Sequence, residues 1–422
     1  MARKMKDSGI EWIGEIPEGW EVGQIGQLYS ERRTKVSDKD YPPLSVTMKG
    51  ILPQLSTAAK TDAHDDRKLV CKGDFAINSR SDRRGSCGIS EQDGSISLIN
   101  TVLQPRGEMN PGYYNWLFHT SMFADEFYKW GHGIVDDLWT TGWSDMKKIG
   151  VPVPSKCEQK QLAEHLNVEC SHIDSILSKT RSSIEEYKKL KQAVITQAVT
   201  KGVRGERKMK DSGVEWIGKV PKEWDVRKLK AVSARINVGV VIRPSEYFDD
   251  NGTVPFLRGI NVKEYTISSE NMVYISQTSN RALSKSQVHT GDILIVRDGN
   301  IGASCVVPSC YNGANVVSMV IVTPNNSCDS RFLCYSLNSE VGKTQFTLTK
   351  IGSALTHTSV SAVSDILSPV PSREEQYEIA DYLDAKCAEI DGLIAKKEQL
   401  VKELEGYKKS LIYEVVTGKR EV

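Results

Sequence analysis

Hydrophobic residues along this chain follow two spacings, and each spacing marks a different kind of element. Near 173–187 and again near 390–404 they recur at steps of three and four, which predicts amphipathic helices with one apolar face. Elsewhere, β-rich runs such as 288–307 are punctuated by Gly, Asn, Asp and Pro, together with helical stretches such as 113–128 and 330–341. The pattern therefore predicts mixed α and β modules joined to two long helices.

The chain repeats itself, and the repeats define its organisation. Segments 4–22 and 208–226 share 13 of 19 residues in the pattern KMKDSGxEWIGxxPxxW, at an offset of 204. A second repeat follows each variable region, where VPVPSKCEQ at 151–159 corresponds to SPVPSREEQ at 368–376 at an offset of 217. The long helical patterns lie in this second repeat. We therefore expect two copies of one module and two copies of one helix.

A weaker correspondence links the two variable regions. Gly-Asp-Phe at 73–75 and Ser-Cys at 86–87 match Gly-Asp-Ile at 291–293 and Ser-Cys at 304–305, at a constant offset of 218. We expect the two modules to share a fold while their surfaces differ.

The helical repeats carry both start and stop signals. Pro-x-Pro precedes each helix, Ser155 and Ser372 are placed to cap the first turns, and Gly202 and Gly418 are placed to end the helices. A solitary helix of about 35 to 40 residues, roughly 50 to 60 Å long, is unstable in water. The two copies are therefore expected to bury their apolar faces against each other. The alternative is that each helix packs on its own module. The expected contact positions are Ile173, Leu177, Ile184, Tyr187, Val194, Ile390, Ile394, Val401, Leu404 and Leu411.

Length and composition limit the class of protein. A chain of 422 residues suggests two globular units plus connectors, and 39% hydrophobic with 26% charged residues is typical of a soluble, cytoplasmic protein. The formal net charge of +1 argues against a wholly basic nucleic-acid coat but leaves room for local basic patches. The nine cysteines lack zinc-ligand spacing, so free thiols are expected and no metal site.

Catalytic motifs are missing from the sequence. The string DYPPL at 40–44 lacks the order and the following aromatic residue of an adenine methyltransferase signature, and no glycine-rich cofactor turn precedes it. No GxxxxGK[ST] phosphate loop occurs. Glu186 and Lys188 have the spacing of a solvated helix face. We therefore expect no catalytic site in this chain.

Two corresponding loops carry the residue types that read DNA. Base edges are contacted by Arg, Lys, Asn, Gln, Asp and Ser on ordered loops, and further basic groups hold phosphates. The loop at 78–86 reads NSRSDRRGS, and its counterpart at 296–302 reads VRDGNIG, so each copy is suited to a different sequence; a solvated hairpin is the alternative for either loop. The candidates are Arg32, Arg33, Lys35, Asn78, Ser79, Arg80, Arg83 and Arg84 in the first module, and Arg243, Arg258, Asn261, Arg297, Asp298 and Asn300 in the second, with Lys49, Lys350 and His357 as weaker ones.

The repeated opening, the Pro-x-Pro-x-x-x-Glu-Gln junctions and the duplicated YKK and VVTG-like helix ends resemble the specificity (S) subunit of Type I restriction-modification systems, the HsdS family, over the whole chain. The resemblance implies a non-catalytic subunit with two target recognition domains. Each would bind one half of a bipartite, asymmetric double-stranded DNA target, separated by an antiparallel coiled coil that sets the half-site spacing.

The resemblance also implies partner subunits. Two modification subunits would bind S-adenosylmethionine and methylate adenine at N6, and restriction subunits would use ATP and Mg, so this chain would bind none of these cofactors. Two other readings stay open, a self-contained restriction or methylation enzyme and a scaffold that binds only proteins.

The expected architecture is α+β with a pseudo-twofold internal duplication. We expect a first target recognition domain at 1–152, a first spacer helix at 153–205, a second domain at 206–369 and a second spacer helix at 370–422. The repeated opening carries four tryptophans that belong either to the cores or to subunit contacts. They are Trp12, Trp20, Trp216 and Trp224.

Overall fold

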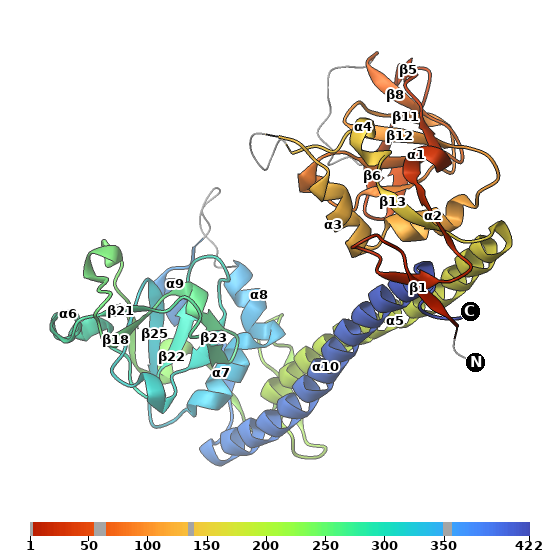
Figure 1. Cartoon of the computed structure of the whole chain (residues 1–422). Helices are drawn as coiled ribbons and strands as arrows, with labels where there is room; N and C mark the ends of the chain where they lie inside the picture. The colour runs from red at the N-terminus through yellow and green to blue at the C-terminus, as the bar shows by residue number, and fades with distance from the viewer. Residues whose placement is uncertain (1–2, 55–64, 134–138, 349–356) are drawn as a thin grey trace. The chain divides into compact units, whose positions relative to one another are not determined.

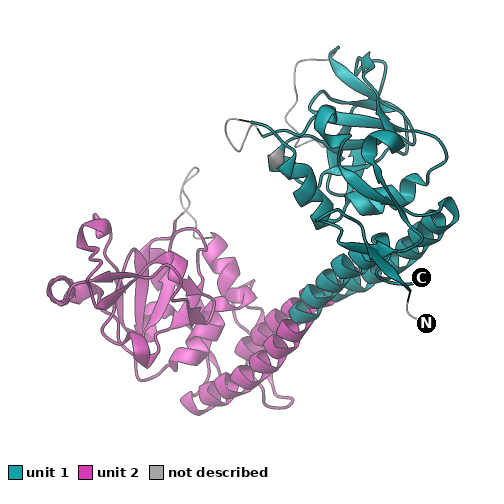
Figure 2. Ribbon diagram, viewed as in Figure 1, with its two compact units in different colours: residues 1–181, 398–422 teal, residues 182–397 magenta. Residues whose placement is uncertain are grey.

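The computed structural model describes residues 3–54, 65–133, 139–348 and 357–422 (Figure 1). The chain forms two compact units, and each combines one module with part of both long helices. Unit 1 contains Met1–Arg181 and Glu398–Val422, and unit 2 contains Ser182–Lys397 (Figure 2). Helices and strands are mixed in both units, as the sequence pattern predicts.

The repeated opening forms the same small hairpin in each unit. In unit 1, β1 (Met5–Asp7) pairs with β2 (Glu15–Pro17), and in unit 2, β14 (Met209–Asp211) pairs with β15 (Lys219–Pro221). Trp12, Trp20 and Trp224 are buried, whereas Trp216 is 39% exposed. Three of the four repeated tryptophans are therefore core residues.

Each module is built on a four-stranded antiparallel sheet with the same strand order. The order is β10-β9-β12-β4 in unit 1 and β23-β22-β25-β17 in unit 2. The strands are β4 (Tyr29–Glu31), β9 (Phe75–Asn78), β10 (Cys87–Ile89) and β12 (Asn100–Pro105), and β17 (Ser233–Val238), β22 (Ile293–Val296), β23 (Ser304–Val306) and β25 (Met319–Pro324). The shared order confirms that the weak repeat at offset 218 reflects a shared fold.

Two helices follow the last strand of each sheet. They are α2 (Pro111–Phe118) and α3 (Ser121–Lys129) in unit 1, and α7 (Ser330–Asn338) and α8 (Glu340–Leu348) in unit 2. The single helical stretches expected at 113–128 and 330–341 are each two helices. The reason is local, because Thr120 accepts a hydrogen bond from Phe123 N and Ser339 accepts one from Gly342 N, and each hydroxyl caps a new helix.

Smaller elements complete each module. Unit 1 contains β3 (Glu21–Gln24), α1 (Ile25–Leu28), β5 (Lys35–Val36), β6 (Leu44–Thr47), β7 (Gly50–Pro53), β8 (Arg67–Val70), β11 (Gly94–Ser97), α4 (Trp143–Met146) and β13 (Gly150–Val153). Unit 2 contains β16 (Asp225–Lys228), β18 (Val254–Leu257), β19 (Val262–Lys263), β20 (Thr266–Ile267), β21 (Val273–Ile275), α6 (Gln277–Ala282), β24 (Asn315–Val316), α9 (Val360–Ser364) and β26 (Leu367–Val370). The pair β3–β13 corresponds to the pair β16–β26.

The long helices are α5 (Lys156–Lys201) and α10 (Arg373–Val416), with 46 and 44 residues. The expected caps are present, because Ser155 Oγ accepts from Glu158 N and Ser372 Oγ accepts from Glu375 N, both at 3.4 Å. Gly202 and Gly418 follow the helix ends at φ 78° and 71°, which favour glycine. The helices exceed the expected 35 to 40 residues because their terminal turns belong to the module cores.

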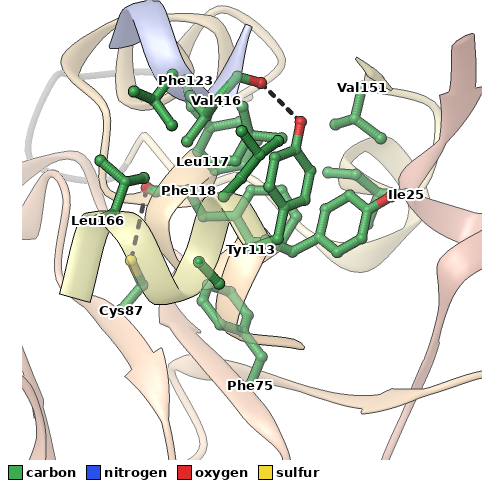
Figure 3. Packing of buried hydrophobic residues seen from close by; sticks show 14 of the residues in the cluster. Ile25, Phe75, Cys87, Tyr113, Leu117, Phe118, Phe123, Val151, Leu166 and Val416 are labelled. Atoms are coloured by element: carbon green, nitrogen blue, oxygen red, sulfur yellow. Dashed lines mark hydrogen bonds between the residues drawn. The ribbon is translucent and has the colours of Figure 1, made fainter. Parts of the chain in front are cut away.

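The core of unit 1 includes both long helices. Figure 3 shows Phe75 of β9, Phe118 of α2 and Phe123 of α3 packed together, with Leu166 of α5 and Val416 of α10 in the same cluster. The Tyr113 hydroxyl donates to the Val416 carbonyl at 2.6 Å, which ties α2 to the end of α10. This core therefore continues across the boundary expected at residues 152 and 153.

Unit 2 repeats this arrangement. Its main core joins Ile195 and Val199 of α5, Ile379 and Leu383 of α10, and Phe332 of α7 in one cluster. The two alternatives for the helices are therefore both realised, because within each unit the helix segments pack on the module and on each other.

The helices run antiparallel within each unit. In unit 1, Lys408 binds Asp174 at 2.6 Å while Arg181, further along α5, binds the earlier Glu405 of α10. In unit 2, Lys191 binds Asp391 at 2.6 Å, which is the Lys408–Asp174 pair repeated at the offset of 217. Of the expected contact positions, Ile173, Leu177, Ile184, Ile390 and Leu411 are buried, and Tyr187, Val194, Ile394, Val401 and Leu404 are half-buried.

The Glu-Gln junction fastens each long helix to its module. Gln159 Nε2 donates to Pro154 O at 2.8 Å, and its Oε1 accepts from the N-cap residue of α2, Asn110, at 2.8 Å. Gln376 makes the equivalent bonds to Pro371 O at 3.0 Å and from Asp329 N at 2.7 Å. The repeated Gln therefore joins two helix starts, a role that the sequence pattern alone did not reveal.

Candidate nucleic-acid interface

The first candidate surface is the β9–β10 turn at 78–86 with the groove beside it. Asn78 Oδ1 accepts from Arg80 N at 3.0 Å, and Ser79 Oγ lies 3.0 Å from Thr101 Oγ1. The Ser79 carbonyl accepts from Thr141 N at 2.9 Å. These bonds order the turn from both sides, so Asn78 and Ser79 support it.

A groove of about 640 Å³ opens beside this turn. Arg80, Arg83 and Arg84 line it together with Thr47 and Met48 of the β6–β7 hairpin. Met48 is 72% exposed, and Lys49 next to it is exposed as well. The sequence pattern did not identify Thr47 or Met48, because only the tertiary fold brings their hairpin to the arginine turn.

The three arginines of the turn have different surroundings. Arg80 is exposed. Arg83 pairs with its neighbour Asp82 at 3.6 Å. Arg84 binds Asp125 of α3 at 2.6 Å and lies 4.7 Å from the centre of the Tyr128 ring. The structure thus brings the predicted cluster together at one groove.

Arg32 has a structural role instead. Its guanidinium binds the buried Asp74 carboxylate through two bonds of 2.6 and 3.2 Å, and this contact raises the pKa of Arg32 above its usual value. Arg235 binds the corresponding Asp292 at 3.2 Å in unit 2. Because the pair recurs in both modules, it belongs to the shared scaffold. Its neighbours Arg33 and Lys35 are exposed and pair with Glu31 and Asp66 at 2.6 and 2.5 Å.

The second candidate surface comprises the loops at 240–246, 297–302 and 316–318. Ser318 joins the three, because its backbone N donates to Val240 O at 3.0 Å and its hydroxyl donates to Asp298 Oδ2 at 3.2 Å. Asp298 and Asn300 are exposed on the β22–β23 turn. Arg297 is half-buried, and its Nε donates to Thr358 O at 2.9 Å.

Backbone strain accompanies this surface. Arg243 and Ser318 have φ values of 43° and 48°, in the left-handed region that L-residues rarely adopt. Arg243 is exposed and pairs with Glu246 at 3.2 Å. Strained residues of this kind persist where the surrounding structure holds them, and they cluster at functional sites.

Arg258 and Asn261 lie in the loop after β18. Arg258 donates to the carbonyl of Asn271, itself strained at φ 52°. Asn261 is fully buried, donates to the carbonyls of Ser268 and Glu270, and accepts from Arg258 N. This corrects its expected contact with DNA, because every hydrogen-bonding group of its amide is used within the loop.

The weaker candidates differ in position. His357 is exposed and forms a backbone bridge with Asp298 at the second surface. Lys350 lies outside the described residues. Glu186 is exposed on α5, as a solvated face predicts.

Within residues 3–54, 65–133, 139–348 and 357–422, no group of three or more His, Cys, Asp or Glu side chains is placed to hold a metal ion. None of the helices in this part of the chain is both long and apolar enough to span a membrane.

Comparisons with known proteins agree with the fold. Residues 221–403 match the family model of the type I restriction modification DNA specificity domain. The MjaVIII specificity subunit of a type I restriction enzyme from Methanocaldococcus jannaschii is 25% identical, covering 96% of this chain and 93% of its own. The EcoBI specificity subunit of Escherichia coli is 23% identical over 58% of this chain and 52% of its own.

Solved structures share the fold over nearly the whole chain. A chain from work on complex assembly and conformational transition of the type I R-M system superimposes with a TM-score of 0.75 at 13% identity, covering 95% of this chain and 98% of its own. The HsdS subunit of Thermoanaerobacter tengcongensis gives 0.53 at 15% identity, covering 96% and 98%.

Residues 221–403 thus have the sequence pattern of a DNA specificity domain, and the chain as a whole has the fold of the type I R-M chain. More particularly, over nearly its whole length the chain is similar to specificity subunits of type I restriction enzymes.

Proposed function

We propose that each module binds one half of a bipartite, asymmetric double-stranded DNA target. The observation that carries the proposal is that the two modules share one sheet but differ in the sequence of the corresponding turn. The two sheets share one strand order, whereas the corresponding turns carry NSRSDRRGS and VRDGNIG. Different polar groups on one scaffold are what two readers of different sequences require.

The long helices, on this proposal, set the distance between the two half-sites. Their lengths of 46 and 44 residues and their mutual packing within each unit support this role, because paired helices form a stiff spacer. The complex would also contain two modification subunits and restriction subunits, docked on the helices and the repeated opening segments.

On this proposal, the chain itself catalyses no reaction. Adenine-N6 methylation with S-adenosylmethionine and DNA cleavage with ATP and Mg would belong to the partner subunits. Purified alone, the chain should transfer no methyl group to DNA, and transfer by the chain alone would favour the reading as a self-contained enzyme.

Module replacement tests the proposal. The chain is co-expressed with its modification subunit, and methylated adenines in the host DNA are mapped. A second chain, in which residues 227–367 are replaced by those of another specificity subunit, is mapped in the same way. The expected result is a split motif that changes in one half only. Absence of a split motif, or a change in both halves, would favour a scaffold that binds only proteins.

A further inference from the structure

We propose that Arg84 reads a guanine in the half-site bound by the first module, and that Asp125 and Tyr128 are the positioning residues that hold its guanidinium for this contact. The inference rests on the proposed DNA-binding function and names one specificity-determining group within it.

Two side chains of α3 hold the Arg84 guanidinium. Asp125 Oδ1 lies 2.6 Å from Nη2, and the Tyr128 ring centre lies 4.7 Å from the guanidinium carbon. Asp125 and Tyr128 are three residues apart on one helix, so they share a face. Tyr128 is itself supported, because Trp139 donates from Nε1 to its carbonyl at 2.9 Å and the two rings lie 6.0 Å apart.

The held guanidinium is still available to a ligand. Its side chain is 48% exposed, and it lines the groove beside the turn. Arginine has five N–H donors, and the bond to Asp125 uses one of them. The remaining donors form a planar fork that matches O6 and N7 of guanine in the major groove. Because the side chain is already oriented, little of its conformational freedom is lost on binding.

The other two arginines of the turn lack this support. Arg83 is 69% exposed, and the only ion pair of its side chain within the described part of the chain is with its neighbour Asp82, at 3.6 Å. Arg80 is exposed, and its side chain forms no hydrogen bond or ion pair with any residue that the structure describes. Flexible cations suit phosphates, which require charge but little geometry. We therefore assign the base contact to Arg84.

The second module lacks all three groups. At the offset of 218, Arg84 corresponds to Gly302, where a Cβ atom would lie 2.5 Å from the Phe346 ring. The helix caps Thr120 and Ser339 align α3 with α8, which places Thr344 and Thr347 at the positions of Asp125 and Tyr128.

The scaffold ion pair of Arg32, by contrast, recurs in both modules. Side chains that both modules need in order to fold should occur in both. Side chains that occur in one module only are expected to serve the recognition of that module's DNA sequence.

The first experiment uses the complex of the chain with its modification subunit. Methylated motifs are mapped for the wild type, Arg84→Lys, Asp125→Asn and the control Glu108→Gln. Glu108 also forms an exposed ion pair in unit 1, with Lys156 at 3.1 Å, but lies outside the first candidate surface. Arg84→Lys keeps the charge and loses the planar fork.

With Arg84→Lys, one G·C position in one half of the motif should become degenerate while the other half is unchanged. Asp125→Asn should relax the same position to a smaller extent, and Glu108→Gln should leave the motif intact. An unchanged motif in Arg84→Lys, or relaxation at an A·T position, overturns the inference while the split motif of the wild type upholds the proposed function. If the wild-type complex yields no split motif, both the inference and the proposed function are contradicted.

A binding measurement separates base contact from phosphate contact. Fluorescence anisotropy compares a cognate duplex with one in which that guanine is 7-deazaguanine, which lacks the N7 acceptor. The wild-type complex should bind the modified duplex roughly 5-fold more weakly, the lower end of the range for a bidentate base contact, because only one of its two acceptors is lost. The Arg84→Ala complex, which has no donor for N7 at this position, should bind the two duplexes equally. Equal binding by the wild type assigns Arg84 to a phosphate and overturns the inference.

Discussion

Replacing Glu375 with Ala should destabilise unit 2 far more than replacing its counterpart Glu158 destabilises unit 1. The Glu375 side chain is 3% exposed, binds Arg207 at 2.5 Å and accepts from Trp224 Nε1 at 3.0 Å. The guanidinium of Arg207 also lies 5.2 Å from the Trp224 ring centre. One carboxylate therefore satisfies a buried donor, Trp224 Nε1, and a half-buried one, the Arg207 guanidinium, at the start of α10.

The expected cost follows from what the substitution leaves behind. Breaking a buried ion pair costs about 3 to 5 kcal/mol, a figure that includes donors left without partners. Arg207 retains Glu223 at 3.1 Å and Lys201 O at 3.0 Å, which lowers the cost. We therefore expect about 3 kcal/mol for Glu375→Ala. Glu375→Gln keeps an acceptor for Trp224 and should recover about 1 kcal/mol.

The counterpart in unit 1 provides the matched control. Glu158 pairs with Arg3, but the two side chains are 23% and 30% exposed, and Trp20 Nε1 has no partner among the described residues. An ion pair this accessible to water contributes about 1 kcal/mol or less. Glu158→Ala should therefore cost about 1 kcal/mol.

Hydrogen–deuterium exchange of the full chain measures each unit separately. A loss of about 3 kcal/mol should accelerate the slowest amides of unit 2 by roughly 150-fold and leave those of unit 1 unchanged. Urea unfolding gives the loss in free energy independently. Equal effects of Glu375→Ala and Glu158→Ala, or a cost below about 1 kcal/mol for Glu375→Ala, would refute this account.

Three further outcomes are expected. Gln376→Ala removes the bonds to Pro371 O and Asp329 N and should cost about 2 to 4 kcal/mol in urea unfolding, whereas a cost near zero would contradict the junction role. Arg32→Ala leaves the buried Asp74 carboxylate without its ion-pair partner, so it should lower the melting temperature without changing the methylated motif. An altered motif would indicate instead that Arg32 contacts DNA. Burial raises the pKa of Cys170 to about 11 and that of Cys305 to about 12, so at pH 8 both stay protonated and iodoacetamide should label the exposed Cys157 and Cys310 first. Mass spectrometry of timed samples checks this order, and labelling of Cys305 as fast as Cys157 would contradict it.

The sequence by itself determined the duplication, the two long helices and their ends. These features depend on local spacing, because Pro-x-Pro, a capping Ser and a terminal Gly act within a few residues of the helix they bound. The arginine turn at 78–86 was also predicted, because its residue types are clustered along the chain.

Only the tertiary structure decided which partner each polar group meets. Arg32 and Arg84 look alike in sequence, yet one binds the buried Asp74 of the scaffold and the other is held beside a groove by Asp125. The Tyr113 bond to Val416 joins residues 303 positions apart and makes the last turn of α10 part of the first module's core. Contacts of this kind depend on how strands and helices pack, and packing is set by the whole fold and not by the spacing of neighbouring residues.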